Sequence, residues 1–234
     1  MKARKVKKLD PKGPLAENAA RIVQVRLDEL RSFVPAALHE DCMIEQHDMR
    51  IAAKRLRYIL ETTEFCFGRA GPTARRRAKD LQDVLGELHD CDEMLPRVEH
   101  HLAELRSADA GAVRERAGEA VDLDPGLAAR APHRTAYRGL EVLAVYVEAR
   151  RRLLFERFRA FWDEQERAGT WERLERAANR TLEEARARRE ARERAARAAE
   201  ELAEAEHVER EAAARARQAA EELRIARQEA GKSG

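Results

Sequence analysis

The chain has few of the residues that interrupt helices and few of those that build sheets. Its 234 residues include only 11 glycines and 7 prolines, and aromatic residues make up 5% of the total. Ala, Glu, Arg and Leu dominate instead, and no segment alternates apolar and polar residues as a half-buried strand would. This composition argues against a sheet-based fold and predicts an all-α protein.

Long apolar runs and cysteine pairs are also lacking. No run approaches the roughly 18 apolar residues that a bilayer-spanning helix needs. The basic N-terminus is not followed by the apolar segment of a secretory signal. Cys42, Cys66 and Cys91 are odd in number and share no short metal-ligand spacing, so we interpret them as reduced, packed thiols. We therefore expect a cytoplasmic protein that does not contact membranes.

An excess of one charge is missing as well. The formal net charge is only +2, whereas proteins that bind nucleic acids often carry a larger basic excess. An anion site in this chain must therefore come from how the charges are arranged and not from their sum.

The charge and apolar patterns divide the chain into three segments. We expect a basic flexible arm at 1–14, an antiparallel helical bundle at 15–168 and a long charged helix rich in Ala, Glu and Arg at 169–234. Helices are predicted at 15–38, 41–67, 73–106 and 135–167, with a short one near 112–120. Pro96 should kink or interrupt the third helix. No sustained heptad continues beyond Arg186, so the last helix is predicted to be isolated, as a spacer or a partner surface.

The most informative segment is His47 to Glu61, within the second predicted helix. At about 100° per residue, one side collects Met49, Ala52, Ala53, Leu56, Ile59 and Leu60. The opposite side collects His47, Arg50, Lys54 and Tyr58, with Arg57 at the margin. Because a helix buries its apolar side, the other side presents one cationic or hydrogen-bonding group per turn. Such a row favours a ligand with regularly repeated anions.

Four further cations could extend this row. Arg75 and Lys79 lie on the polar side of the third predicted helix, beside Arg76 and Gln82. Arg26 and Arg151 instead fall on apolar stripes, where an unpaired guanidinium would be costly. Each of these two arginines either pairs with a carboxylate or reaches the edge of its stripe, or it points into a water-filled groove shared with the other cations. In the groove interpretation, repulsion among the cations makes stability depend on a polyanionic ligand.

Two linked motifs add a family resemblance. The second predicted helix carries His47, Asp48, Arg50, Lys54, Arg55, Leu56, Arg57 and Tyr58, and the third carries Leu81, Gln82, Leu85, Gly86 and Asp90. In order and spacing they resemble the CHAD family, the conserved histidine α-helical domain. The resemblance covers about residues 15–168.

The resemblance implies an all-helical fold with a basic groove that binds inorganic polyphosphate, without a cofactor and without catalytic activity. The family's basic positions correspond to His47, Arg50, Lys54, Arg57 and Lys79. With the periodicity, the full predicted polyphosphate-binding set is His47, Arg50, Lys54, Arg57, Tyr58, Arg75, Lys79, Arg26 and Arg151. The family usually carries two related repeats, but this chain shows one copy of each motif. Either the second repeat has degenerated, one repeat works alone, or a homodimer supplies the other.

Three other functions fit parts of the pattern. An RNA-binding protein would use the same cations but should add stacking aromatics, and Tyr58 is the one aromatic on the basic side. A metal-binding or phosphoacceptor domain could use His47, His89 with Asp90, or His100 with His101, although no local ligand spacing supports it. A scaffold could use the C-terminal helix to recruit partners or to attach the domain to polyphosphate or storage granules.

Overall fold

The computed structural model describes residues 2–230, and every regular element in that range is a helix. The all-α fold is therefore confirmed. The chain divides into two compact units, Met1–Leu182 and Glu183–Gly234, which are described separately below. Within the described residues no helix is both long enough and apolar enough to cross a membrane.

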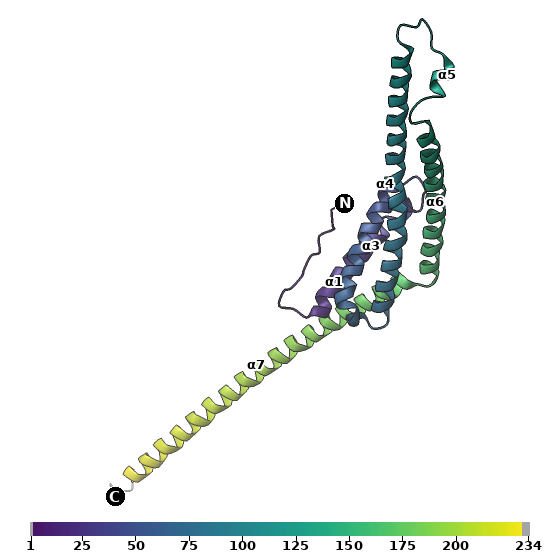
Figure 1. Ribbon diagram of the computed structural model, residues 1–234. Coiled ribbons are helices and arrows are strands. Elements are labelled where there is room, and N and C mark those ends of the chain that lie inside the picture. Colours follow the sequence, from purple (N-terminus) through teal and green to yellow (C-terminus); the bar gives the residue numbers. More distant parts are fainter. Residues whose placement is uncertain (1, 231–234) are drawn as a thin grey trace. The chain divides into compact units, whose positions relative to one another are not determined.

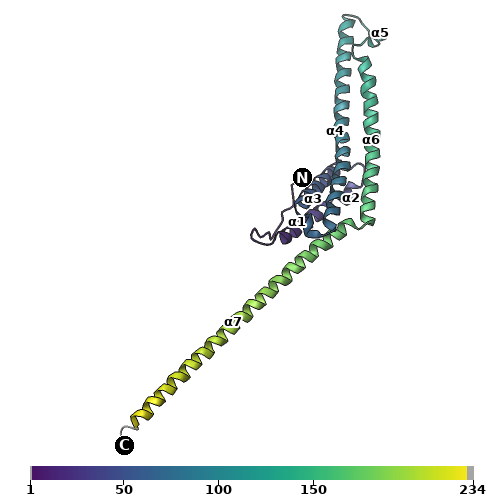
Figure 2. The ribbon, with the colours of Figure 1, turned by 60° about the horizontal axis from the view of Figure 1, so that its bottom comes forward.

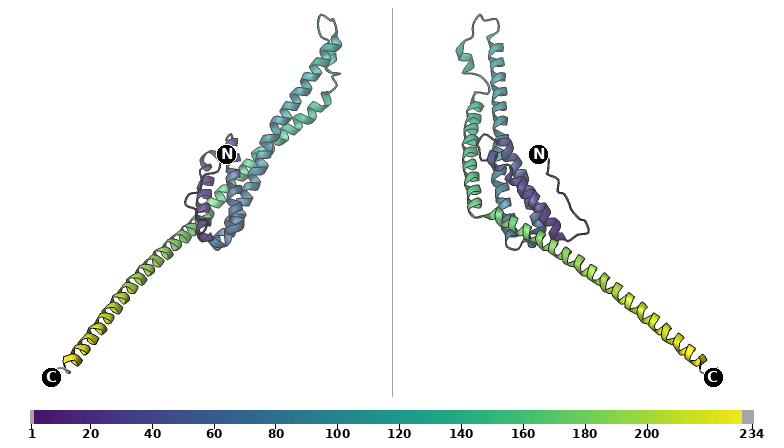
Figure 3. Two further views of the ribbon diagram at one scale, coloured as in Figure 1. Left: turned by 90° about the vertical axis from the view of Figure 1, so that its left-hand side faces the viewer. Right: turned by 180° about the vertical axis from the view of Figure 1, so that it is seen from behind.

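The first unit is built around two long antiparallel helices. In order along the chain, its elements are α1 (Leu15–Arg31), α2 (Val34–Ala37), α3 (Met43–Thr63), the 3-10 helix η1 (Glu64–Phe67), α4 (Ala70–Ala117), α5 (Pro125–Ala128), α6 (Arg134–Arg167) and the first turns of α7 (Thr170–Ala230). Figures 1 and 2 show α4 and α6 side by side along their length. Helix α3 packs against the part of α4 where that helix begins, and α1 packs against α3 (Figure 3).

Two helices that were predicted to span a proline have other ends than expected. The helix expected over 15–38 ends at Arg31 and resumes at Val34, because Pro35 lacks an amide hydrogen and its ring collides with the carbonyl one turn earlier. By contrast, α4 continues through Pro96 to Ala117 and absorbs the short helix expected near 112–120. The apolar side continues past Pro96 with the buried Val98 and Leu102, so packing holds this part of α4 in helical form.

The apolar faces predicted from periodicity form the core. On α3, Met49, Ala52, Ala53, Leu56 and Leu60 have no exposed surface. They pack in one cluster with residues of α1, α4, α6 and the start of α7. Burying a large aliphatic side chain contributes about 1.5–3 kcal/mol. This face therefore fixes α3 firmly and determines which of its side chains stay outside.

The first unit extends beyond the expected bundle boundary at residue 168. Trp171 and Leu174, in the first turns of α7, are fully buried. The ring of Trp171 stacks on that of Trp162 with centroids 5.9 Å apart. The compact unit consequently ends at Leu182, because an apolar stripe in the first turns of α7 completes the core.

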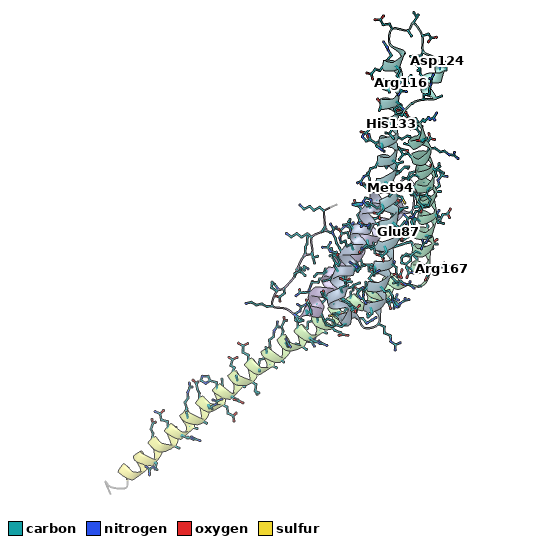
Figure 4. The ribbon with its side chains drawn as sticks, in the orientation of Figure 1. Glu87, Met94, Arg116, Asp124, His133 and Arg167 are labelled. Atoms are coloured by element: carbon teal, nitrogen blue, oxygen red, sulfur yellow. The ribbon has the colours of Figure 1, made fainter. Side chains whose placement is uncertain are left out.

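A polar contact fixes the far end of the α4–α6 pair. Asp109 is buried and accepts hydrogen bonds from the Tyr137 hydroxyl and from the backbone amide of His133, with the His133 ring Nδ1 2.8 Å away. Burial and the hydrogen bond to Asp109 raise the pKa of Tyr137 to about 12. In Figure 4, Glu87 and Met94 mark successive levels of the hairpin below His133.

The second unit is the rest of α7. Among its described side chains nearly all are exposed, and opposite charges pair one turn apart, as in Arg186–Glu190 and Glu206–Arg210, both at 2.9 Å. Such pairs stabilise an exposed helix by about 0.2–0.5 kcal/mol each. The second unit lies within the segment 169–234 for which a charged helix was predicted.

Candidate anion-binding site

The polar side of α3 is arranged as its periodicity predicts. His47, Arg50, Lys54 and Arg57 follow one another at intervals of three or four residues and are all partly exposed. Tyr58 is 49% exposed beside them. Because the opposite side of α3 is fully buried in the core, these side chains project from a rigid support.

The second motif lies directly opposite, on α4. The rings of His47 and His89 have centroids 4.4 Å apart. One turn further along α3, Arg50 lies against Gly86, where an added Cβ would be 3.4 Å from the Arg50 Nε. The helices run antiparallel, so the same register sets Lys54 opposite Gln82, and Arg57 opposite Lys79.

We call this arrangement the α3–α4 seam. Its members are His47, Arg50, Lys54 and Arg57 of α3 and Lys79, Gln82, Gly86 and His89 of α4. Four of their polar atoms are buried without a hydrogen-bond partner among the described residues: His47 Nδ1, Arg50 Nε, Arg57 Nε and Gln82 Oε1. Buried polar groups in folded proteins are nearly always paired, so these four atoms leave the seam with unused hydrogen-bonding capacity.

The charge balance of the seam differs between its centre and its end. At the end near η1, Arg57 pairs with Glu61 at 3.4 Å and Lys79 with Asp83 at 2.5 Å. In the part of the chain that the structure describes, neither Arg50 nor Lys54 has a carboxylate within ion-pair distance. The positive charge is therefore least compensated at the centre of the seam.

Tyr58 orients two of the cations. The Lys54 ammonium lies 5.7 Å, and the Arg57 guanidinium 4.7 Å, from the centroid of the Tyr58 ring. Cation–π contacts of this kind are worth about 0.5–1 kcal/mol at exposed sites. The aromatic ring consequently serves as a support for the cations.

His47 is held in its neutral form. Burial lowers the pKa of His47, and the neighbouring His89 and Arg50 lower it further, while Asp48 opposes them. At neutral pH the ring is thus an uncharged hydrogen-bonding group at one end of the cationic row.

Arg75 lies beyond the seam, near the start of α4. Its Nε donates to Glu64 of η1 at 2.5 Å, and its side chain is 37% exposed. This pair joins α4 to η1, so Arg75 stands at the edge of the predicted set and already has a carboxylate.

Arg26 and Arg151 do not converge on the seam, contrary to the groove interpretation. Arg26 pairs at 2.5 Å with the buried Glu29, which also binds Arg55 at 2.8 Å. The N-terminal arm joins the same cluster, because the Arg4 amide donates to Glu29. On this side of α1 the guanidinium neutralises a buried carboxylate.

Arg151 is 8% exposed, and its Nε donates to Asp92 at 2.5 Å. The same guanidinium also donates to Gln46 and to the Glu40 carbonyl. A buried guanidinium is costly unless it is fully paired. Arg26 and Arg151 are therefore paired with carboxylates, which was the other interpretation given for them, and do not point into a shared groove.

Three seam residues were absent from the predicted set: Gln82, Gly86 and His89. The available signal was their spacing of four and three residues, which places them on one side of a helix. The helix register, and therefore their position opposite α3, required the structure. Among the described residues no three His, Cys, Asp or Glu side chains group as metal ligands would.

Comparison with known proteins agrees with the two motifs. Residues 2–99 match the family model described as CHAD domain, which includes α1 to α3 and the part of α4 that forms the seam. The match confirms the family resemblance over this segment and not over the expected range of 15–168. No curated protein and no solved structure matches the chain.

Proposed function

With the CHAD assignment of residues 2–99 as the premise, we propose that the α3–α4 seam binds inorganic polyphosphate. The observation that carries the proposal is the pair of buried, unpartnered Nε–H groups of Arg50 and Arg57, with the uncompensated ammonium of Lys54 between them. A guanidinium Nε–H can only donate, so its missing partner is an acceptor. Phosphate oxygens are acceptors that suit guanidinium geometry and lysine charge together.

The length of the seam favours a linear ligand. His47 and Arg57 are ten residues apart on α3, or roughly 15 Å at 1.5 Å per residue. A single phosphate could reach only one turn of such a row. A chain of phosphoryl units can satisfy one group per turn along its whole length.

The energetics of the empty site favour a polyanion. Arg50, Lys54 and Arg57 are like charges on neighbouring turns and repel one another in the absence of ligand. A polyanion replaces this repulsion with attraction and releases its own counterions, so binding should weaken steeply as salt is added. Rotating the Gln82 amide by half a turn would present its NH₂ to the same ligand.

Tyr58 favours polyphosphate over RNA. Recognition of single-stranded RNA relies on aromatic rings that stack on exposed bases. The Tyr58 ring is instead in contact with Lys54 and Arg57 of the same helix. The seam therefore offers positive charge and hydrogen-bond donors, but its aromatic ring is already used in contacts with these cations and is not positioned to stack on a base.

We further propose that the seam binds without catalysis, because its members are donors suited to holding an anion. The expected setting is the cytoplasm, where polyphosphate granules would present the ligand at high local concentration. The charged helix of the second unit would then act as a spacer or as a surface for partners.

Calorimetry of the full chain with polyphosphate of defined lengths tests this proposal, with short RNA at equal phosphate concentration as the competitor. The double variant Arg50→Ala/Lys54→Ala should lose most of its affinity and keep its helicity. Arg97→Ala/Arg138→Ala removes the same charge from exposed positions of α4 and α6, and it should bind like the wild type. Wild-type affinity in the first variant, or displacement of polyphosphate by RNA, would refute the proposal.

A further inference from the structure

Helix α6 has a second apolar side that nothing in the described chain covers. Val142, Val145, Tyr146 and Leu153 are each more than half exposed. The inner side of the same helix is buried against α4 and includes Val147 and Phe158, so the exposed residues are additional to those that the fold requires. An apolar strip of this kind on a charged helix marks an interaction surface.

The strip has the spacing of a helix-pairing surface. Val142, Tyr146, Ala149 and Leu153 follow at intervals of four, three and four residues, which is the a/d pattern of paired helices. Ala149 lies at the middle of the strip. Together with Val145 and Leu153 it lines a shallow hollow, and its small side chain would let the backbone of another helix approach closely.

The charged residues on one flank of the strip could pair with the same residues of a second α6. Glu141 and Glu148 precede Ala149, whereas Arg152 and Arg159 follow it, and all four lie on the same flank of α6. If a second α6 runs in the opposite direction and crosses at the level of residue 150, next to Ala149, Glu148 of each copy faces Arg152 of the other, and Glu141 faces Arg159. A second copy of α6 necessarily carries this complementary order of charges, whereas an unrelated helix would match it only by coincidence.

We propose that α6 binds the α6 of a second copy of this chain in antiparallel orientation, centred next to Ala149 at the level of residue 150. The present partners of these charges do not oppose the pairing. Glu148 pairs with Arg152 of its own helix, and Glu141 with Arg106, but both pairs are exposed. Exposed pairs contribute little, so they can be exchanged for pairs between copies. The seam lies on α3 and α4, so this inference does not depend on the proposed function.

Sedimentation velocity of the full chain over a concentration series tests the surface. The wild type should sediment with twice the mass of one 26.7 kDa chain. Val145→Lys should shift the mass to that of one chain, while circular dichroism keeps its helical signal because the side chain is 67% exposed. Val121→Lys, at a fully exposed position outside α6, is the matched control and should remain a dimer.

Charge reversal tests the orientation. In an antiparallel pair, Arg152→Glu places a glutamate opposite Glu148 at both symmetry-related positions. The two repulsive contacts should dissociate the dimer. The double variant Glu148→Arg/Arg152→Glu restores opposite charges in the same register and should recover the dimer. A monomeric wild type, a dimeric Val145→Lys variant, or a double variant as dissociated as Arg152→Glu would each overturn the proposal.

Discussion

Gly86→Ala should strengthen the fold and weaken the binding of polyphosphate. Gly86 lies inside α4, where glycine is less favourable than alanine by about 0.8–1.0 kcal/mol. The added Cβ would stand 3.4 Å from the Arg50 Nε, an ordinary van der Waals distance, so no repacking offsets the gain. For a protein of this size the gain corresponds to a rise in melting temperature of roughly 2–4 °C.

The same methyl group would occupy space beside the unpartnered Nε of Arg50. If a phosphate oxygen completes that donor, the variant loses a hydrogen bond between charged groups, worth about 1.5–3 kcal/mol. The affinity for polyphosphate should then fall by roughly ten- to hundredfold. Stability and affinity would change in opposite directions, which a general loosening of the helix pair cannot produce.

Gly111→Ala is the matched control for this experiment. Gly111 lies in the same helix and has no atom within 4 Å of its added Cβ. It should gain similar stability, measured by thermal denaturation, and keep the wild-type affinity, measured by calorimetry. If Gly86→Ala gained stability and bound polyphosphate as tightly as Gly111→Ala, the assignment of the Arg50 Nε as a ligand contact would be wrong.

Three further predictions concern the core and the seam. Leu56→Asp should unfold the first unit, losing more than about 4 kcal/mol, because it buries a charge at the centre of the α3 apolar face; a cooperative wild-type melting curve would contradict this. Asp92→Asn should cost up to about 3–5 kcal/mol in chemical denaturation, since it removes the nearer carboxylate of the buried Arg151 guanidinium and leaves only that of Glu40, 3.9 Å away. Burial, then His89, lowers the pKa of His47, and a bound polyanion raises it again, so protons are taken up on binding. Affinity should therefore increase from neutral pH toward about pH 5, and His47→Gln should flatten this dependence in a calorimetric pH series.

Periodicity predicted the parts of the structure that depend on one helix at a time. It identified which side of α3 is buried because a helix repeats every 3.6 residues and the apolar residues of this segment follow that repeat closely. It also placed His47, Arg50, Lys54 and Arg57 on the opposite side in the right order. The break before Val34 is equally local, because Pro35 signals it, but the apolar stripe continues across it through Val34 and Ala37.

Features that depend on two distant segments could not be predicted in the same way. Arg151 and Asp92 are 59 residues apart, and only the antiparallel packing of α4 and α6 makes them partners. The periodicity showed that Arg151 lies on an apolar stripe, yet it could not show which carboxylate compensates it. The role of Gly86 was hidden for the same reason, because the side chain that it accommodates belongs to another helix.

The seam also shows why a binding site of this kind needs a firm support. Each unpaired buried donor costs about 1–3 kcal/mol, and the Nε atoms of Arg50 and Arg57 both lack a partner. The fully buried opposite face of α3 offsets this cost and holds the helix in its orientation. A ligand that supplies the missing acceptors removes the cost and binds only the folded state, so its binding free energy adds directly to stability. The contacts that keep α3 in place would thus also hold these donors in position for the polyanion proposed above.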